Sequence, residues 1–66
     1  MKEIGHLIRN KRKDLGLTQR QVAEKTGCTY ATISSLEQGR HVSTFYLMTV
    51  LEILGLEIVV KDKESN

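Results

Sequence analysis

The stretch of sequence that decides the fold is residues 17–40, LTQRQVAEKTGCTYATISSLEQGR. Thr18 stands three residues before Gln21, the spacing of a capping box in which each side chain bonds the backbone of the other residue. This spacing predicts a helix over residues 19–26. Gly27 follows it directly and can adopt the left-handed conformation that commonly ends a helix.

A second helix is predicted immediately after the first. Thr29 can cap a segment over residues 30–38, and Gly39 can end that segment. Only Gly27-Cys28-Thr29 separates the two helices. Two short helices joined by a three-residue turn that contains glycine are typical of the helix-turn-helix, in which the first helix crosses the DNA backbone and the second lies in the major groove.

Upstream of this stretch, the spacing of apolar residues predicts another helix. Apolar side chains recur at helical intervals before Gly16, which can end the helix. They are Ile4, Leu7, Ile8 and Leu15. We therefore expect these four residues on one face of the helix.

Downstream, Ser43 is a predicted N-cap for a fourth helix that ends near Leu54, before Gly55. Its apolar stripe consists of Leu47, Val50, Leu51 and Leu54. With no proline in the chain, each helix boundary depends on glycine and hydroxyl residues. Residues 1–55 are thus expected to form one domain.

Residues 56–61 have a different pattern, LEIVVK, which is rich in β-branched residues and predicts a strand. No other segment resembles a strand, so its backbone groups need a partner in another chain. We expect a dimer in which two copies of this strand pair. The residues predicted to form the dimer strand are Leu56, Ile58, Val59 and Val60. Residues 62–66 are polar and are predicted to be a disordered tail.

Length and charge narrow the class of protein. The chain has 66 residues and a net charge of +2, enough for one small domain. Residues 1–42 contain eight Lys and Arg against four Asp and Glu, whereas residues 43–66 contain two against four. The basic part suits a polyanion, although a solvated helix surface is the commoner meaning of such charge. No apolar run or leader pattern suggests a membrane or export, so a cytoplasmic location is expected.

Several positions together resemble the Cro and lambda-repressor type (XRE) helix-turn-helix family. They are Leu17-Thr18-Gln19, Ala23, Gly27, Thr29, Thr32-Ile33-Ser34, Leu36-Glu37 and Gly39-Arg40, and the similarity covers residues 4–55. The resemblance implies an all-α, lambda-repressor-like bundle of four helices, extended here by the C-terminal strand. It also implies a structural salt bridge between Arg12 and Glu37.

The same resemblance, combined with the docking geometry of the motif, assigns residues to the DNA. The expected base-facing residues are Tyr30, Ala31, Ser34 and Ser35, and the expected phosphate contacts are Gln19, Thr29, Lys25 and Arg40. None of the base-facing residues is Arg, Asn or Gln, the usual side chains that recognise guanine and adenine. DNA shape is therefore expected to carry part of the specificity.

The C-terminal part resembles one branch of the family more closely. Leu54-Gly55-Leu56-Glu57 before a β run, and Tyr30-Ala31-Thr32-Ile33-Ser34, are similar to HipB-type antitoxins. That resemblance implies a homodimer on a palindromic operator, repression of its own operon and a HipA-type kinase toxin as partner. Two alternatives remain: a free-standing regulator without a toxin, and a protein-interaction adaptor on the same fold.

Catalysis and metal binding have little support in the sequence. His6, His41 and Cys28 lie on different predicted elements without the spacing of metal ligands, and Cys28 is more simply a small packed residue. No nucleophile, base and carboxylate can be grouped, and no phosphate-binding glycine loop is present. We therefore expect no enzyme activity, no metal and no cofactor. Phe45, Tyr46 and Met48 could form an exposed patch, but core or dimer packing is the commoner role.

Overall fold

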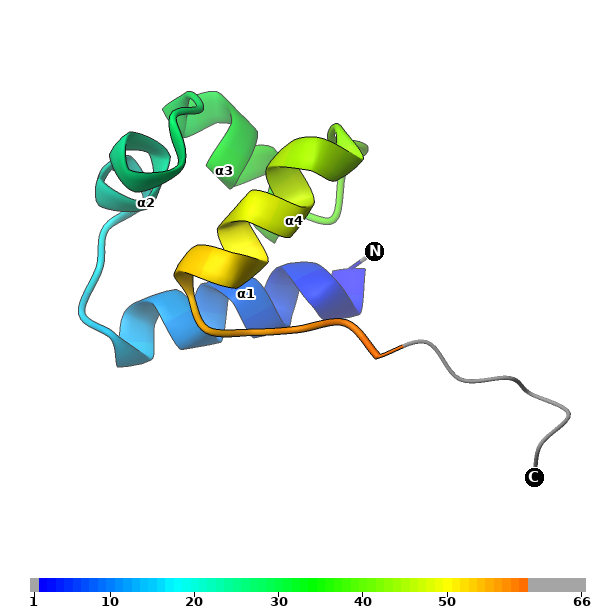
Figure 1. The fold of residues 1–66 in the computed structure, drawn as a ribbon, viewed down its shortest axis with the longest axis horizontal. Coiled ribbons are helices and arrows are strands. Elements are labelled where there is room, and N and C mark those ends of the chain that lie inside the picture. Colours follow the sequence, from blue (N-terminus) through cyan, green and yellow to red (C-terminus); the bar gives the residue numbers. More distant parts are fainter. Residues whose placement is uncertain (1, 60–66) are drawn as a thin grey trace, which may run out of the picture.

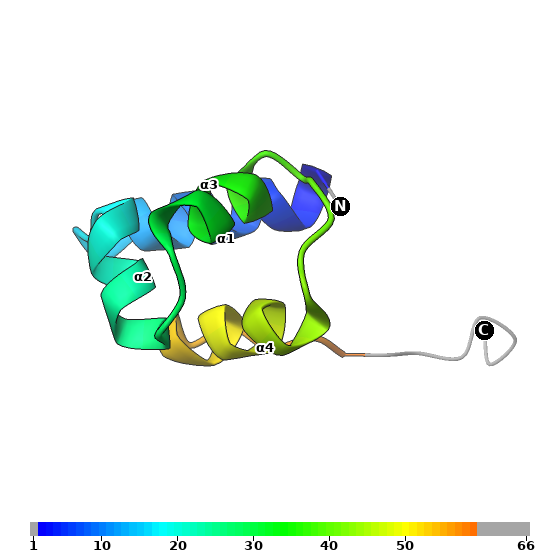
Figure 2. The same cartoon turned by 90° about the horizontal axis from the view of Figure 1, so that it is seen from above.

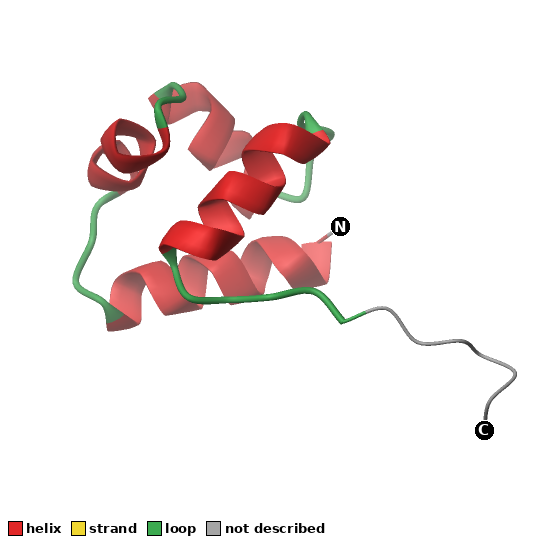
Figure 3. Cartoon of the chain, in the orientation of Figure 1, coloured by secondary structure: helices red, strands yellow, loops and turns green. Residues whose placement is uncertain are grey.

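The computed structural model describes residues 2–59, which form a bundle of four helices (Figure 1). Their order and type agree with the prediction, and each boundary lies within about two residues of the expected one. Figure 3 shows no strand in this part of the chain. The helices are α1 (Lys2–Asp14), α2 (Gln19–Thr26), α3 (Tyr30–Glu37) and α4 (Thr44–Ile53).

One hydrophobic core joins all four helices. In Figure 2, α1 and α3 lie along one side of the molecule and α4 along the other, while α2 contacts both α3 and α4. The most deeply buried side chains are Ile8, Val22, Ile33, Leu36, Val50 and Leu54. Because these residues come from every helix, the core fixes the position of α3 relative to its neighbours.

Gly5 allows α1 to approach α3 closely. A Cβ atom at this position would lie 2.6 Å from the carbonyl oxygen of Leu36 and 2.7 Å from that of Glu37. Both distances are shorter than any ordinary contact, so only glycine fits between the two backbones. The apolar periodicity does not reveal this residue, because glycine has no side chain to contribute to a stripe.

Only part of the predicted apolar face of the first helix is buried. Leu7 and Leu15 are 61% and 49% exposed, whereas Ile8 is fully buried and Ile4 packs against the core. The face turned inward is centred on Gly5, Ile8 and Arg12. The backbone of Gly5 lies against α3, so the side of α1 that carries Gly5 and Ile8 faces inward and Leu7 lies off that side.

The helix ends confirm most of the predicted signals. Thr18 Oγ1 accepts from Gln21 N–H at 3.1 Å, and Gln21 Oε1 accepts from Thr18 N–H at 2.7 Å, so the capping box is complete. Gly27 has φ 74°, a conformation that favours glycine. The predicted cap at Ser43 is wrong in one respect: Ser43 precedes α4, but its side chain makes no capping hydrogen bond.

The C-terminal segment also departs from the prediction. Residues 56–59 belong to neither a helix nor a strand, and Val60 and Lys61 lie outside the described residues. After α4 the chain reverses and runs back toward the end of the molecule where α1 begins (Figure 1). A strand paired across a dimer requires a second chain for its hydrogen bonds, so the dimer strand stays a prediction.

Candidate nucleic-acid interface

A buried ion pair fixes the helix-turn-helix to α1. Arg12 Nε donates to Glu37 Oε2 at 2.6 Å, and Arg12 Nη2 donates to Glu37 Oε1 at 3.0 Å. The remaining guanidinium nitrogen, Nη1, donates to the carbonyl of Leu17 at 2.8 Å. The salt bridge that the resemblance implied is therefore present, with bidentate geometry, and it joins α1, the loop before α2 and α3.

Arg12 and Glu37 are both buried, so loss of either partner should lower the stability of the fold. Arg12 is 9% exposed and Glu37 7%. The hydrogen bond with Glu37 raises the pKa of Arg12 above its ordinary value, although burial opposes the shift. Since the raised pKa favours the charged form in the folded state, this stabilisation is present in full at neutral pH and is lost only at strongly alkaline pH.

Gln19 joins the same network. Its Nε2 donates to Glu37 Oε1 at 3.1 Å, so one of the two amide N–H groups is used inside the protein. The other N–H group is not fixed by this bond. Gln19 is half-buried at the first turn of α2. Its contact with a phosphate stays a prediction, and the bond to Glu37 would orient its side chain for that contact.

The four predicted base-facing residues lie on one face of α3. Tyr30 and Ala31 are exposed in its first turn, and Ser34 and Ser35 follow one turn later, partly exposed. Ser34 Oγ accepts from Gln38 Nε2 at 2.8 Å. An amide side chain therefore lies beside this face, and Gln38 is not among the residues that the sequence assigned to the DNA.

Two surface hollows flank the exposed face of α3. One, of about 280 Å³, lies toward α1 and is lined by Arg9, Gln19, Ser34 and Gln38 together with the ion pair. The other, of about 320 Å³, lies toward α4, and its lining includes Ala31, Ser35, His41 and Tyr46. The face of α3 is thus a ridge with polar groups on both sides, a form that can enter a groove.

Among the other predicted phosphate contacts, Thr29 already makes a hydrogen bond within the protein, whereas Lys25 and Arg40 are exposed cations. Thr29 Oγ1 accepts from Thr32 N–H at 3.2 Å, so this hydroxyl already caps α3. Lys25 is exposed in the last turn of α2, and Arg40 is exposed after α3. Neither of these cations lines the two hollows beside α3.

Within residues 2–59, no group of three or more His, Cys, Asp and Glu side chains could hold a metal ion. Cys28 instead packs against the core, with its Sγ 3.0 Å from Thr26 Oγ1. No helix in the described part of the chain has the length and apolar character to cross a membrane.

Comparison with known proteins agrees with this geometry. The model of a helix-turn-helix family matches residues 8–60. A protein of Methanothermobacter thermautotrophicus, described as an uncharacterized HTH-type transcriptional regulator, is 51% identical over 52 residues, which cover 77% of this chain and 75% of that protein. The chain belongs to the XRE-type helix-turn-helix family.

Proposed function

We propose that the protein is a homodimeric transcriptional repressor that binds a palindromic DNA operator. The observation that carries the proposal is the exposed face of α3, held by a buried and fully bonded ion pair to α1. A rigid helix with an exposed N-terminal end is what major-groove binding requires. Family membership supports the same conclusion.

The interface divides into two kinds of contact. Tyr30, Ala31, Ser34 and Ser35 face the bases, while Gln19, Thr29, Lys25 and Arg40 contact phosphates. The base-facing side chains offer hydroxyl groups and a small apolar surface, which suit a thymine methyl group and the polar edges of bases. The phosphate contacts give affinity for any DNA sequence, and the base-facing residues of α3 give preference for one particular sequence.

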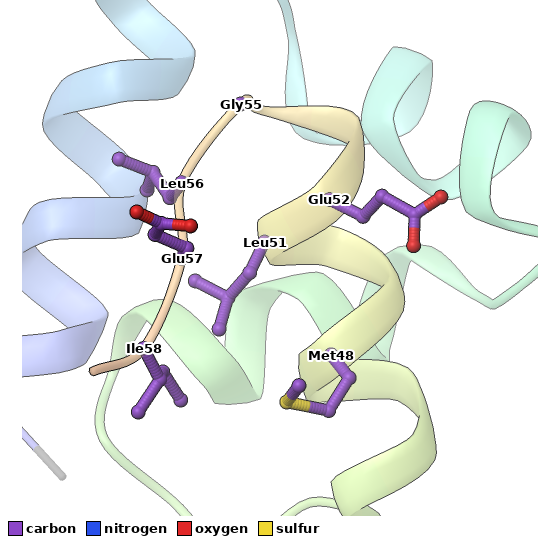
Figure 4. Close-up of a pocket in the computed structure, with 7 residues that line it drawn as sticks. All are labelled: Met48, Leu51, Glu52, Gly55, Leu56, Glu57 and Ile58. Carbon is purple, nitrogen blue, oxygen red and sulfur yellow. The ribbon is translucent and has the colours of Figure 1, made fainter. Parts of the chain in front are cut away.

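A second copy of the chain is the proposed partner at the C-terminal segment. Ile58 and Val59 are 46% and 68% exposed. Beside them, Met48 and Leu51 extend from α4 toward the segment that carries Leu56 and Ile58, and these residues line a groove of about 530 Å³ (Figure 4). Pairing of two such segments would cover these apolar groups.

Two-fold symmetry follows from this arrangement. Antiparallel pairing about a centre near Ile58 and Val59 places the same surface of each copy against the other. The dimer must then set its two α3 helices about 34 Å apart, one turn of DNA. A palindromic operator matches that symmetry.

A more specific role rests on sequence resemblance alone. The similarity to HipB-type antitoxins leads us to propose that the operator lies in the protein's own operon and that a HipA-type kinase toxin is a partner. A gene for a kinase-like protein beside this one, and a stable complex of the two purified products, are the expected results. Without such a gene, the free-standing regulator is the better description.

The direct test of DNA binding is a fluorescence titration. The probes are the duplex upstream of the protein's own gene and a scrambled duplex of equal length and composition, each at several salt concentrations. We expect about 10³-fold or greater preference for the upstream duplex. Equal, weak binding to both duplexes would contradict a sequence-specific repressor, and no binding to either would favour the adaptor.

Two variants separate the kinds of contact. Arg40→Ala should weaken binding to both duplexes alike and reduce the salt dependence by about one unit, because one phosphate contact is lost. Ser34→Ala should leave the salt dependence unchanged and reduce the preference for the upstream duplex. If Arg40→Ala leaves the salt dependence unchanged, Arg40 is not a phosphate contact.

A further inference from the structure

Arg20 and Tyr30 form a pair that links α2 to the start of α3. The guanidinium carbon of Arg20 lies over the Tyr30 ring, 5.4 Å from its centroid. Arg20 is exposed in the first turn of α2, and Tyr30 is 49% exposed as the first residue of α3. A planar guanidinium stacked on a ring has one face covered, while its N–H groups project from its edges.

Arg20 has no ion-pair partner in the described part of the chain. Among residues 2–59 the one ion pair within 4.0 Å joins Arg12 and Glu37, although Glu24 lies only one turn from Arg20 on α2. No side-chain hydrogen bond within those residues involves Arg20. All five guanidinium N–H groups are therefore available to a ligand.

The position of the pair points to DNA bases. Arg20 and Tyr30 together line two hollows, one of about 490 Å³ with Thr18 and Gln19, and one of about 340 Å³ with Ala23. The pair thus stands between the first turn of α2 and the first turn of α3. The N-terminal residues of the second helix are those that meet base edges in a helix-turn-helix.

We infer that Arg20 is a specificity-determining residue that recognises a guanine in each half-site, and that Tyr30 is the positioning residue that holds its guanidinium. This inference rests on the proposed DNA-binding function. Two parallel N–H groups of Arg match the O6 and N7 acceptors of guanine in the major groove. Arg20 thereby supplies, from α2, the long donor that the base-facing residues of α3 lack.

The test is selection of binding sites from a pool of duplexes with a random core, followed by sequencing. The wild-type protein should select a guanine at one position in each half-site. Arg20→Lys keeps the charge but loses the two-pronged donor, so it should lose the preference at that position and keep the others. Arg40→Lys is the matched control, and it should keep the guanine because a phosphate contact tolerates either cation.

A second arm uses the selected duplex with 7-deazaguanine at that position, which removes the N7 acceptor. Wild-type affinity should fall about tenfold, while Arg20→Lys should bind both duplexes equally. Tyr30→Phe retains the ring under the guanidinium and should keep the guanine preference, whereas Tyr30→Leu should lose it.

The outcomes distinguish this inference from the proposed function. An Arg20→Lys protein that selects the same guanine, or that loses affinity equally for every sequence, would overturn the inference while leaving the repressor intact. A wild-type protein that selects no sequence would overturn both.

Discussion

The junction between α1 and α3, formed by Arg12 and Glu37, has its hydrogen-bonding groups satisfied within one chain, whereas the C-terminal segment leaves apolar side chains exposed. At the junction, every nitrogen of Arg12 that can donate has an acceptor, and both carboxylate oxygens of Glu37 are occupied. At the C-terminal segment, Ile58 and Val59 are exposed, and Ile58 lines a groove. The first region thus needs no partner, whereas the second leaves apolar surface that a second copy would cover.

This difference separates two tasks of the molecule. The junction sets the orientation of α3 within one copy, and in the proposed dimer the C-terminal segment would set the distance between two copies of α3. We therefore expect substitutions at the junction to act on stability, and substitutions at the segment to act on assembly.

Breaking the ion pair should have the largest effect on stability. Arg12→Met or Glu37→Met alone leaves one buried charge without its partner, and each should lower the free energy of unfolding by about 3–5 kcal/mol. The measurement is urea unfolding followed by circular dichroism, at one fixed protein concentration because the stability of the proposed dimer would depend on it. Arg9→Met, on the exposed side of the same helix, is the control and should change stability by less than about 0.5 kcal/mol.

The double variant Arg12→Met with Glu37→Met completes the cycle. Removing both charges leaves neither unpaired, so the combined loss should be well below the sum of the two single losses. Additive losses would mean that the two residues do not interact, and the junction could not be described as complete within the chain.

Gly5→Ala should have the next largest effect. The added methyl group would clash with the backbone of α3 at Leu36 and Glu37, and overpacking of this kind costs about 1–3 kcal/mol. Asn10→Ala is the matched control: it is exposed on α1, so it gains helix propensity without a clash. If thermal melting shows Gly5→Ala to be as stable as wild type, the two backbones do not approach so closely.

The smallest predicted difference lies between two helix starts. Thr18→Ala removes a capping hydrogen bond and should cost about 1 kcal/mol. Ser43→Ala removes a hydroxyl that makes no such bond, so its effect should be clearly smaller in the same denaturant titration. Equal losses would show that the Ser43 side chain does cap α4 in solution.

The parts of the fold that the sequence predicts well depend on residues close together in the chain. The capping box needs only Thr18 and Gln21, and the turn needs only Gly27 at positive φ. Such signals act within one helical turn, so they can be recognised in the sequence without knowing which helices pack together. The bond between Arg12 and Glu37 spans 25 residues, and it was accessible only through family resemblance.

The parts that were missed depend on how helices cross. Leu7 fits the apolar spacing of α1, but the contact of Gly5 with α3 decides which face is buried. The Arg20–Tyr30 stack joins residues from two helices, and its geometry depends on the turn between them. Neither leaves a periodic signal. The dimer strand is a different case, because its hydrogen-bond partners would belong to another chain.

The most direct test of the proposed dimer is the mass of the protein in solution. Sedimentation velocity at micromolar concentration should show the full chain as a dimer and Ile58→Pro as a monomer, because proline removes an N–H group that the paired strands require. Leu15→Lys, which changes an exposed apolar residue just after α1, should stay dimeric. An Ile58→Pro protein that remains a dimer would contradict the claim that the C-terminal segment joins two copies.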